Sequence, residues 1–305
     1  MIKLSLCLSG KYGVKKMNLK ITDVRGITAD SAFLIDDGTT SIVCDSGFSF
    51  TGEKVAEKVK LALGERKLDY IFLTHSHYDH VLGSLHIKKR FPEAKVVSCE
   101  YAAKIFEKPT ARAVMRDMDN KAREKYGAES CEDLIDNLKV DITLKDGEVI
   151  KAGDMEFTLI SFPGHTKCST GYYLKKDKFL IGSETLGIYG GNGVVAPSYL
   201  VGYEMTLDSI SRAEKLDIEK MLVPHYGVID KEEVKTYLRE GRRNVVAVAK
   251  EISSMIENGK TEEDAFLFFK DKFFHGYIRE IWPEDAMALN TGIMVKLIKK
   301  ELLGQ

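Results

Sequence analysis

The segment His75-Ser76-His77-Tyr78-Asp79-His80 holds three of the seven histidines of this chain within six residues. It follows directly on the apolar run at residues 68–74, which is typical of a buried strand. Three imidazoles and a carboxylate this close would repel one another if protonated, and would cost stability if buried without partners. A divalent cation removes both problems, because neutral imidazole and carboxylate are its usual ligands. The segment therefore predicts a metal site on the loop after a strand.

The spacing within this segment allows it to serve two adjacent ions. His75 and His77 can point to one side of the loop while Asp79 and His80 turn to the other. An isolated histidine is more often a core or surface residue, and that is the interpretation for His86 and His275. For His275, which lies in an aromatic stretch at residues 273–277, lining of an active-site mouth is the alternative.

Strand and helix patterns alternate through the first 230 residues. Strands are expected at residues 32–35, 40–45, 68–74, 95–98, 140–144, 156–162, 171–174 and 179–182. Asp36-Asp37-Gly38 predicts a hairpin turn between the first two. Helices are expected at residues 52–64 and from about residue 82 to just before Pro92. A charged, alanine-rich segment at about residues 100–137 predicts a helical insertion.

The last part of the chain, residues 231–305, has helical periodicity and few strand signals. We therefore expect an α/β domain at residues 1–230 and a helical C-terminal section at 231–305 that packs on it. The section is rich in rings, namely Phe266, Phe268, Phe269, Phe273, Phe274, Tyr277 and Trp282. So much apolar surface on a short segment predicts a roof over the active site, with a distal face or a homodimer contact as the alternative.

Composition excludes several classes of protein. The 305 residues carry a net charge of −1, which gives no general attraction to nucleic acid or to an acidic membrane surface. The five dispersed cysteines contain no CxxC pair, which argues against a disulfide framework and favours a cytoplasmic location. No stretch approaches the roughly 20 apolar residues of a membrane span, and the N-terminal apolar run is too short for a secretory signal. Whether Met1 or Met17 is the functional start stays open.

Four further motifs accompany the histidine segment. They are Val43-Cys44-Asp45-Ser46-Gly47, then Asp146-Gly147 with Phe162-Pro163-Gly164-His165-Thr166, then Leu180-Ile181-Gly182-Ser183-Glu184-Thr185, and Leu222-Val223-Pro224-His225-Tyr226-Gly227. In this order, across about residues 20–230, the sequence resembles the metallo-β-lactamase-fold superfamily, and its glyoxalase II-like and thioesterase-like members most. The resemblance implies an αββα sandwich, with two β-sheets face to face, helices outside and the active site at one sheet edge.

The resemblance also implies a ligand set for two divalent ions, with zinc expected first and iron or manganese as alternatives. The first ion would be held by His75, His77 and His165, and the second by Asp79, His80 and His225. Glu184 stands where the family has a bridging Asp, so a bridge or a plain surface acid are its two interpretations. Asp45 would orient a ligand histidine, or merely form a turn before a glycine. Cys168 follows the motif of His165 as a small buried residue or an oxidation-sensitive thiol.

The expected activity is hydrolysis of a small ester, thioester or lactone by metal-activated water, with Asp79 or Glu184 assisting proton transfer. Alternatives are a flavodiiron-like di-iron oxidoreductase, a phosphodiesterase and a non-catalytic metal-bound ligand sensor. Flavodiiron-type proteins typically have an acid where His77 stands, which argues against that class. The partner is expected to be a small molecule, with no nucleic acid or membrane, and a homodimer stays open. A glycine-rich loop at residues 189–193, with Tyr199 and Tyr203, is either a flexible rim of the site or a surface loop.

Overall fold

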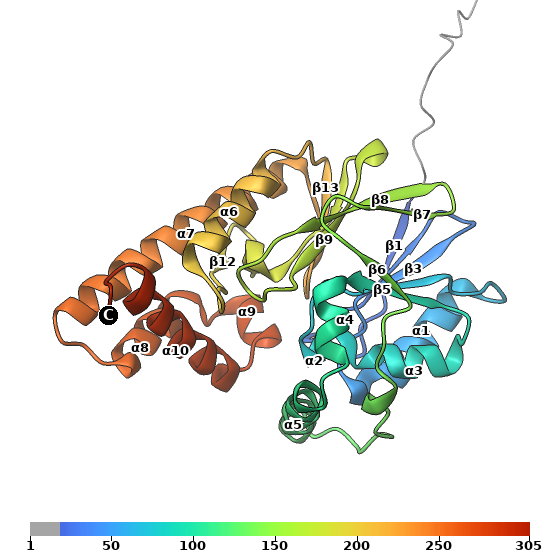
Figure 1. Ribbon diagram of the computed structural model, residues 1–305, viewed down its shortest axis with the longest axis horizontal. Helices are drawn as coiled ribbons and strands as arrows, with labels where there is room; N and C mark the ends of the chain where they lie inside the picture. Colours follow the sequence, from blue (N-terminus) through green and yellow to red (C-terminus); the bar gives the residue numbers. More distant parts are fainter. Residues whose placement is uncertain (1–18) are drawn as a thin grey trace, which may run out of the picture.

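The computed structural model describes residues 19–305, so Cys7, one of the five cysteines, and the choice between Met1 and Met17 as the start lie outside the described residues. Two six-stranded sheets face each other, and helices cover the outer side of each sheet (Figure 1). The αββα fold class expected from the sequence is confirmed. Within residues 19–305 no helix is both long and apolar enough to cross a membrane.

The first sheet changes from antiparallel to parallel pairing along its order. Its strands are, in order, β1 (Lys20–Asp23), β2 (Phe33–Asp36), β3 (Ser41–Cys44), β4 (Tyr70–Phe72), β5 (Lys95–Cys99) and β6 (Ile142–Leu144). The β2–β3 pair is the expected hairpin, and β3 to β6 pair in parallel. Parallel neighbours need crossover connections. These are α1 (Gly52–Leu63), α3 (Gly83–Arg90), α4 (Glu100–Phe106) and α5 (Pro109–Lys125).

The second sheet is antiparallel except for one pair. Its strands are, in order, β14 (Gly227–Asp230), β13 (Lys220–Val223), β10 (Phe179–Ile181), β9 (Thr170–Leu174), β8 (Met155–Ser161) and β7 (Val149–Ala152). The parallel pair β10–β13 is connected through α6 (Tyr203–Glu214) and the two-stranded ladder β11 (Ile188–Tyr189) and β12 (Val195–Ala196). The sequence patterns did not predict β1, β7, α6 or the strands from β11 to β14.

Aromatic rings join the two sheets face to face. The Phe72 ring of β4 lies 5.5 Å, centroid to centroid, from Phe157 of β8 and 4.6 Å from Tyr172 of β9. All three side chains are fully buried. The Tyr172 hydroxyl donates a hydrogen bond to the carbonyl of Leu73 (3.0 Å), so its polar atom is satisfied inside the core. This layer fixes the two sheets, and hence the loops at their ends, relative to each other.

Of the C-terminal helices, the first packs against β13 and β14 of the second sheet, and the second and fourth pack against the first helix. They are α7 (Lys231–Glu257), α8 (Glu262–Phe273), α9 (Gly276–Ile281) and α10 (Glu284–Glu301). Met221 and Val223 of β13 share one hydrophobic cluster with Val248, Phe269 and Trp282 from this section. The apolar faces of these helices are therefore continuous with the core of the sandwich.

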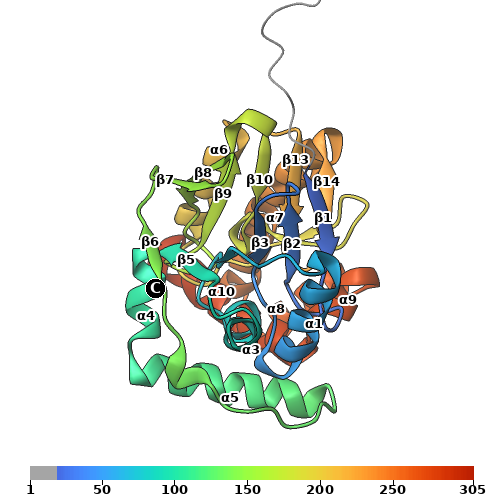
Figure 2. The ribbon, with the colours of Figure 1, turned by 90° about the vertical axis from the view of Figure 1, so that its right-hand side faces the viewer.

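The segment between β5 and β6 is less helical than expected. Helix α4 ends at Phe106 and α5 ends at Lys125, and residues 126–141 contain only a short 3-10 turn at Ile135–Asn137. In Figure 2, α5 runs along the bottom of the molecule, below α1 and α3. In Figure 1, α10 lies to the left of α2 (Tyr78–Val81) and α5 lies below it.

Gly83 lets the start of α3 dock against the loop after β3. Its N–H donates to the carbonyl of Gly47 (3.0 Å), and a Cβ at this position would lie 1.9 Å from the carbonyl oxygen of Ser46. Ser46 in turn donates from its N–H (2.8 Å) and its hydroxyl (2.7 Å) to the carbonyl of His80. This close approach fixes the histidine segment against the end of β3.

We predict that Gly83→Ala lowers the free energy of unfolding by about 1–3 kcal/mol, because the added methyl group overpacks this contact. The control is Gly292→Ala in α10, where the nearest atom to a new Cβ is Glu262 Oε2 at 3.9 Å. That change should be neutral or stabilising by up to about 1 kcal/mol, since alanine is the better helix former. Chemical denaturation of both variants measures the difference, and equal effects would contradict the prediction.

Candidate metal centre

The histidine segment leaves β4 as an extended loop and then forms a single helical turn. His77 has an extended backbone (φ −75°, ψ 146°) and precedes α2, which was not expected from the sequence. The change from extended to helical backbone after His77 separates the directions of the side chains. His75 and His77 therefore point to one group of ligand atoms, whereas Asp79 and His80 point to another.

The structure brings together all seven residues that the sequence predicted as ligands. One group contains His75, His77, His165 and Glu184, and the other contains Asp79, His80 and His225. Within each group, the nitrogen or oxygen atoms that could bind an ion lie within 4.8 Å of one another. Each group could hold a divalent cation.

The two histidines from the second sheet are held by backbone carbonyls. His165, on the loop after β8, donates from Nδ1 to the carbonyl of Ser198 (2.9 Å). His225, between β13 and β14, donates from Nδ1 to the carbonyl of Ala29 (2.9 Å). Because a carbonyl can only accept, the proton of each neutral ring is on Nδ1 and the lone pair is on Nε2. Both Nε2 atoms face the other ligands.

The contacts between ring nitrogens fit a cation better than a network of hydrogen bonds. His225 Nε2 lies 3.1 Å from His80 Nε2, although both rings already use Nδ1 as a donor. Two lone pairs at this distance repel unless a proton or a cation lies between or beside them. His75 Nε2 is buried and has no hydrogen-bond partner within residues 19–305. The donor set, imidazole nitrogens with carboxylate oxygens, is one that zinc, iron and manganese accept.

Glu184 lies between the two groups. Its Oε1 is 2.5 Å from His225 Nε2 and 3.2 Å from His80 Nε2, and its Oε2 is 2.8 Å from His165 Nε2. One carboxylate oxygen therefore faces each group. The residue is 6% exposed, so its interpretation as a surface acid is wrong.

The surroundings favour the protonation states that bind metal. Burial lowers the pKa of His75 and of His77 well below the usual value, so both rings are neutral at neutral pH. Burial alone would raise the pKa of Glu184, but the positive charge that the rings of His165, His80 and His225 carry when protonated outweighs it and holds the pKa well below its usual value. Neutral imidazole and ionised carboxylate are the forms that coordinate a cation.

Asp45 binds the Nδ1 side of the His80 ring, away from the candidate metal position. Its buried carboxylate accepts from His80 Nδ1 (2.8 Å), from the N–H of Thr74 (2.9 Å) and from the hydroxyl of Ser31 (3.2 Å). Burial works against a proton on His80, yet the carboxylates of Asp45, Asp79 and Glu184 raise the pKa of this ring well above its usual value. The same negative charges favour a metal ion at His80 Nε2. Asp45 is therefore more than a turn former.

Backbone strain is concentrated at this centre. Within the described chain, the non-glycine residues with positive φ are Asp45 (52°), Lys178 (53°), Asn192 (50°) and His225 (61°). Two of the four belong to the ligand groups or their support. L-residues adopt this conformation at a cost, which persists where the surroundings hold the residue in place.

A cavity of about 480 Å³ opens above the two groups. Its floor includes His77, Asp79, His165, Glu184 and His225, and its walls come mainly from α5 and α10 with Trp282 between α9 and α10. In the sequence, these wall residues appear only as apolar residues at helical spacing, such as Met115, Met118 and Ala122. Such a pattern predicts that the residues are buried, but it does not predict a cavity.

The structure decides three expectations about the surroundings of the site, which concern the loop at residues 189–193, His275 and Cys168. The loop at residues 189–193 does not form the rim, because the Tyr189 ring is buried against Tyr226 and Tyr237, and Tyr199 is fully buried. His275 is exposed and lies outside the cavity, so its lining role is wrong. Cys168 is a buried residue, 2% exposed.

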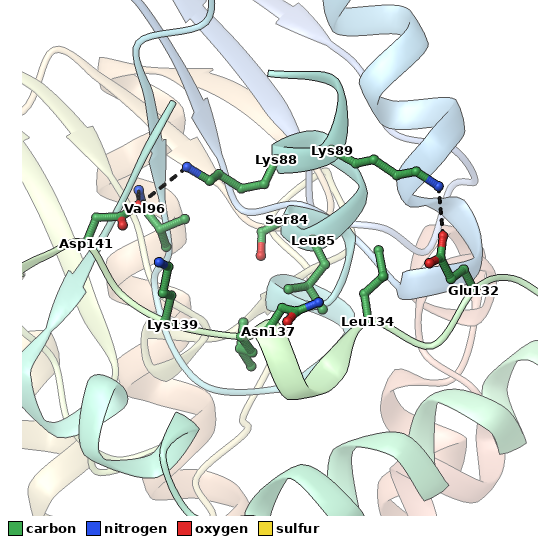
Figure 3. Close-up of a pocket in the computed structure, with 11 residues that line it drawn as sticks. Ser84, Leu85, Lys88, Lys89, Val96, Glu132, Leu134, Asn137, Lys139 and Asp141 are labelled. Atoms are coloured by element: carbon green, nitrogen blue, oxygen red, sulfur yellow. Dashed lines mark hydrogen bonds and ion pairs between the residues drawn. The ribbon is translucent and has the colours of Figure 1, made fainter. Parts of the chain in front are cut away.

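A second cavity, of about 390 Å³, lies between α3 and the chain that enters β6 (Figure 3). Lys88 pairs with Asp141 (3.7 Å) and Lys89 with Glu132 (2.7 Å) across its opening. None of the seven candidate ligands lines it. Lys88 and Lys89 are engaged in these ion pairs, and we assign no chemistry to the cavity.

We predict that Asp45→Asn lowers the affinity for metal about 10- to 100-fold, the usual loss when a partner behind a ligand histidine is changed. Asparagine tolerates the positive φ of this position, so the variant tests the charge rather than the backbone. Competition with a chromogenic chelator measures the affinity. Ser31→Ala is the control, because it removes a donor to the same carboxylate without touching His80. Equal affinities of Asp45→Asn and the parent protein would contradict the role of Asp45.

Comparison with known proteins identifies a family model and several relatives that match most of the chain. Residues 26–225 match the family model described as "Metallo-beta-lactamase superfamily". A metallo-beta-lactamase fold-containing protein of Sulfurisphaera tokodaii is 28% identical over 220 residues, covering 68% of this chain and 73% of that protein. Hydroxyacylglutathione hydrolase 1 of Vibrio vulnificus is 24% identical over 287 residues, covering 84% of this chain and 99% of that protein.

A solved structure has a similar arrangement of elements over most of its length. The metallo-beta-lactamase family protein from Thermus thermophilus superposes with a TM-score of 0.60 at 17% identity, covering 88% of each chain. At this level of identity the likeness concerns the fold alone.

Proposed function

The chain belongs to the metallo-beta-lactamase superfamily, and from this premise we propose that it is a hydrolase which binds two divalent metal ions and cleaves a small ester, thioester or lactone. The observation that carries the proposal is the position of Glu184, with one carboxylate oxygen facing each group of candidate ligands. A carboxylate in this position can bridge two ions, so the dinuclear site is the simplest occupant of the centre.

In the proposed site, His75, His77 and His165 would hold the first ion, Asp79, His80 and His225 would hold the second, and Glu184 would offer one carboxylate oxygen to each. When bound in such a site, divalent ions supply a nucleophilic hydroxide at neutral pH and polarise a carbonyl oxygen. The many imidazole ligands favour zinc, and iron or manganese would fit the same donors.

The side chains of the protein would orient and protonate the reactants. The carbonyls of Ser198 and Ala29 keep the protons of His165 and His225 away from the centre. The carboxylate of Asp79 is 22% exposed and lies at the floor of the cavity, where it can accept a proton from water and return it to the leaving group. The walls of the cavity would exclude bulk water from the reacting carbonyl.

The choice of a hydrolase over the other classes has two supports. The Vibrio vulnificus relative is named as a hydroxyacylglutathione hydrolase. His77 stands at a position where the flavodiiron class typically has an acid, and the structure directs this imidazole at His165 Nε2 (2.9 Å). Phosphodiester cleavage and ligand sensing without catalysis become outcomes of the experiment below.

We predict two transition-metal ions per chain in protein purified without a chelator, and hydrolysis of at least one ester or thioester. Elemental analysis and a panel of esters, thioesters, lactones and phosphodiesters measure these properties. A protein that contains no metal and takes up none on titration would remove the proposal. If the protein cleaved only phosphodiesters, the proposed substrate class of esters, thioesters and lactones would be wrong.

His77→Ala should reduce turnover more than about 100-fold. Replacing a residue that only hydrogen-bonds to a ligand histidine typically costs about 10- to 100-fold, and removing a ligand itself should cost more. The fold should persist, since apolar burial between the sheets holds the sandwich. His275→Ala is the matched control: it removes an exposed imidazole outside the cavity and should leave turnover unchanged. Circular dichroism of both variants checks the fold. Unchanged turnover in folded His77→Ala would contradict the assignment.

A further inference from the structure

The cavity above the candidate metal centre is apolar away from its floor. Two helices from distant parts of the chain form opposite walls, α5 with Val114 and Met118 and α10 with Leu289 and Ile293. Trp282 closes the wall beside α10. Cavities of about 300–1,000 Å³ lined in this way bind small molecules through their apolar surface, with a few polar groups fixing the orientation. Here most of the polar groups gather at the metal-binding end, and Asn290 of α10 adds one uncharged amide to the wall.

Two of the wall residues are exposed although they are large and apolar. Val114 is 63% exposed and Leu289 is 53% exposed, and they reach the same cavity from opposite helices. A folded protein gains stability by burying such side chains, so a pair of them at the mouth of a cavity marks a surface that a ligand covers.

The walls of the cavity offer no positively charged side chain that could pair with a carboxylate of a substrate. Among the residues that line this cavity, all within the described range 19–305, none is lysine or arginine. Two cations on neighbouring segments are already engaged: Lys125 pairs with Asp285, and Arg25 binds Asp23 and the carbonyl of His225. A carboxylate placed between α5 and α10 would lose water without gaining a counter-charge.

We infer that the substrate carries a bulky, uncharged apolar acyl group, held between α5 and α10, and that thioesters with an anionic peptide arm such as glutathione are poor substrates. The inference rests on the proposed hydrolase activity and deepens it by naming the substrate class. In the reaction, the hydroxyl of water bonds to the carbonyl carbon and the carbon–oxygen or carbon–sulfur bond breaks. The leaving group takes the remaining proton, so the products are a carboxylic acid and an alcohol or thiol.

The first test compares thioesters that differ in one property at a time. N-acetylcysteamine thioesters with acetyl, butanoyl, hexanoyl and octanoyl groups vary the apolar acyl group alone. The kcat/KM should rise about tenfold or more from acetyl to octanoyl, since each added methylene is removed from water in the cavity. Octanoyl-glutathione keeps the acyl group but adds anionic carboxylates, and its kcat/KM should be at least about tenfold lower than that of the octanoyl N-acetylcysteamine thioester.

The second test measures binding without catalysis. Trp282 is the only tryptophan of the chain and it lines the cavity, so its fluorescence reports occupancy. Octanamide, an uncharged amide that resists hydrolysis, should give a saturable change in emission. Acetamide and S-methylglutathione at the same concentrations should give none. Binding of S-methylglutathione as tight as that of octanamide would overturn the inference.

A pair of leucine variants ties the effect to the cavity. Leu289→Lys places a charge in the wall of the cavity, whereas Leu267→Lys changes a leucine on α8 that is 52% exposed and lies outside it. Leu289→Lys should lower kcat/KM for the octanoyl substrate at least about fivefold and change the acetyl substrate less, because only the longer chain reaches the wall. Leu267→Lys should change neither. Equal effects of the two variants would overturn the assignment of the wall.

The outcomes separate this inference from the proposed function. Hydrolysis of every thioester at the same kcat/KM, with no binding of octanamide, would leave the hydrolase standing and remove the apolar substrate class. Saturable binding of octanamide without hydrolysis of any substrate by metal-loaded protein would support the apolar site and remove the hydrolase.

Discussion

The hydrogen bonds of one buried carboxylate, Asp45, hold the centre together. At the end of β3, this side chain binds the backbone of Thr74 at the end of β4 and the ring of His80 on the next helical turn. The backbone at Asp45 is held in the left-handed region, and its N–H donates to the carbonyl of Phe72. The direction of the His80 ring, and with it the position of the second group of ligands, depends on these contacts.

Glu184 adds a constraint of length to this arrangement. It occupies the place of a bridging Asp in the resembled pattern, and its additional methylene extends the carboxylate further from the backbone. The structure accommodates this reach, because the two oxygens face His165 and His225 from opposite groups. The distance between the groups and the length of this side chain are therefore coupled.

Much of this architecture was predictable because the decisive residues are chemically unusual and close together in the sequence. The histidine segment predicted a metal site by itself, and the ordered motifs predicted the sandwich and all seven candidate ligands. The walls were not predictable, since apolar residues at helical spacing, such as Met115 and Met118, look the same in a core and in a cavity. The prediction that the glycine-rich loop at residues 189–193 forms a flexible rim was wrong for a related reason. The glycines indicate a turn, but they do not show that the Tyr189 ring is buried and anchors this loop in the core.

The floor and the walls of the cavity come from separate parts of the chain. Every candidate ligand lies on a loop or turn at the ends of sandwich strands, whereas α5 belongs to the segment between β5 and β6 and α10 to the C-terminal section. Mutations in these two helices can change the shape of the cavity while the ligands keep their supports. Such a division makes the protein evolvable: new substrates can be acquired through the helices without rebuilding the chemistry, and directed evolution of this scaffold would best be confined to them.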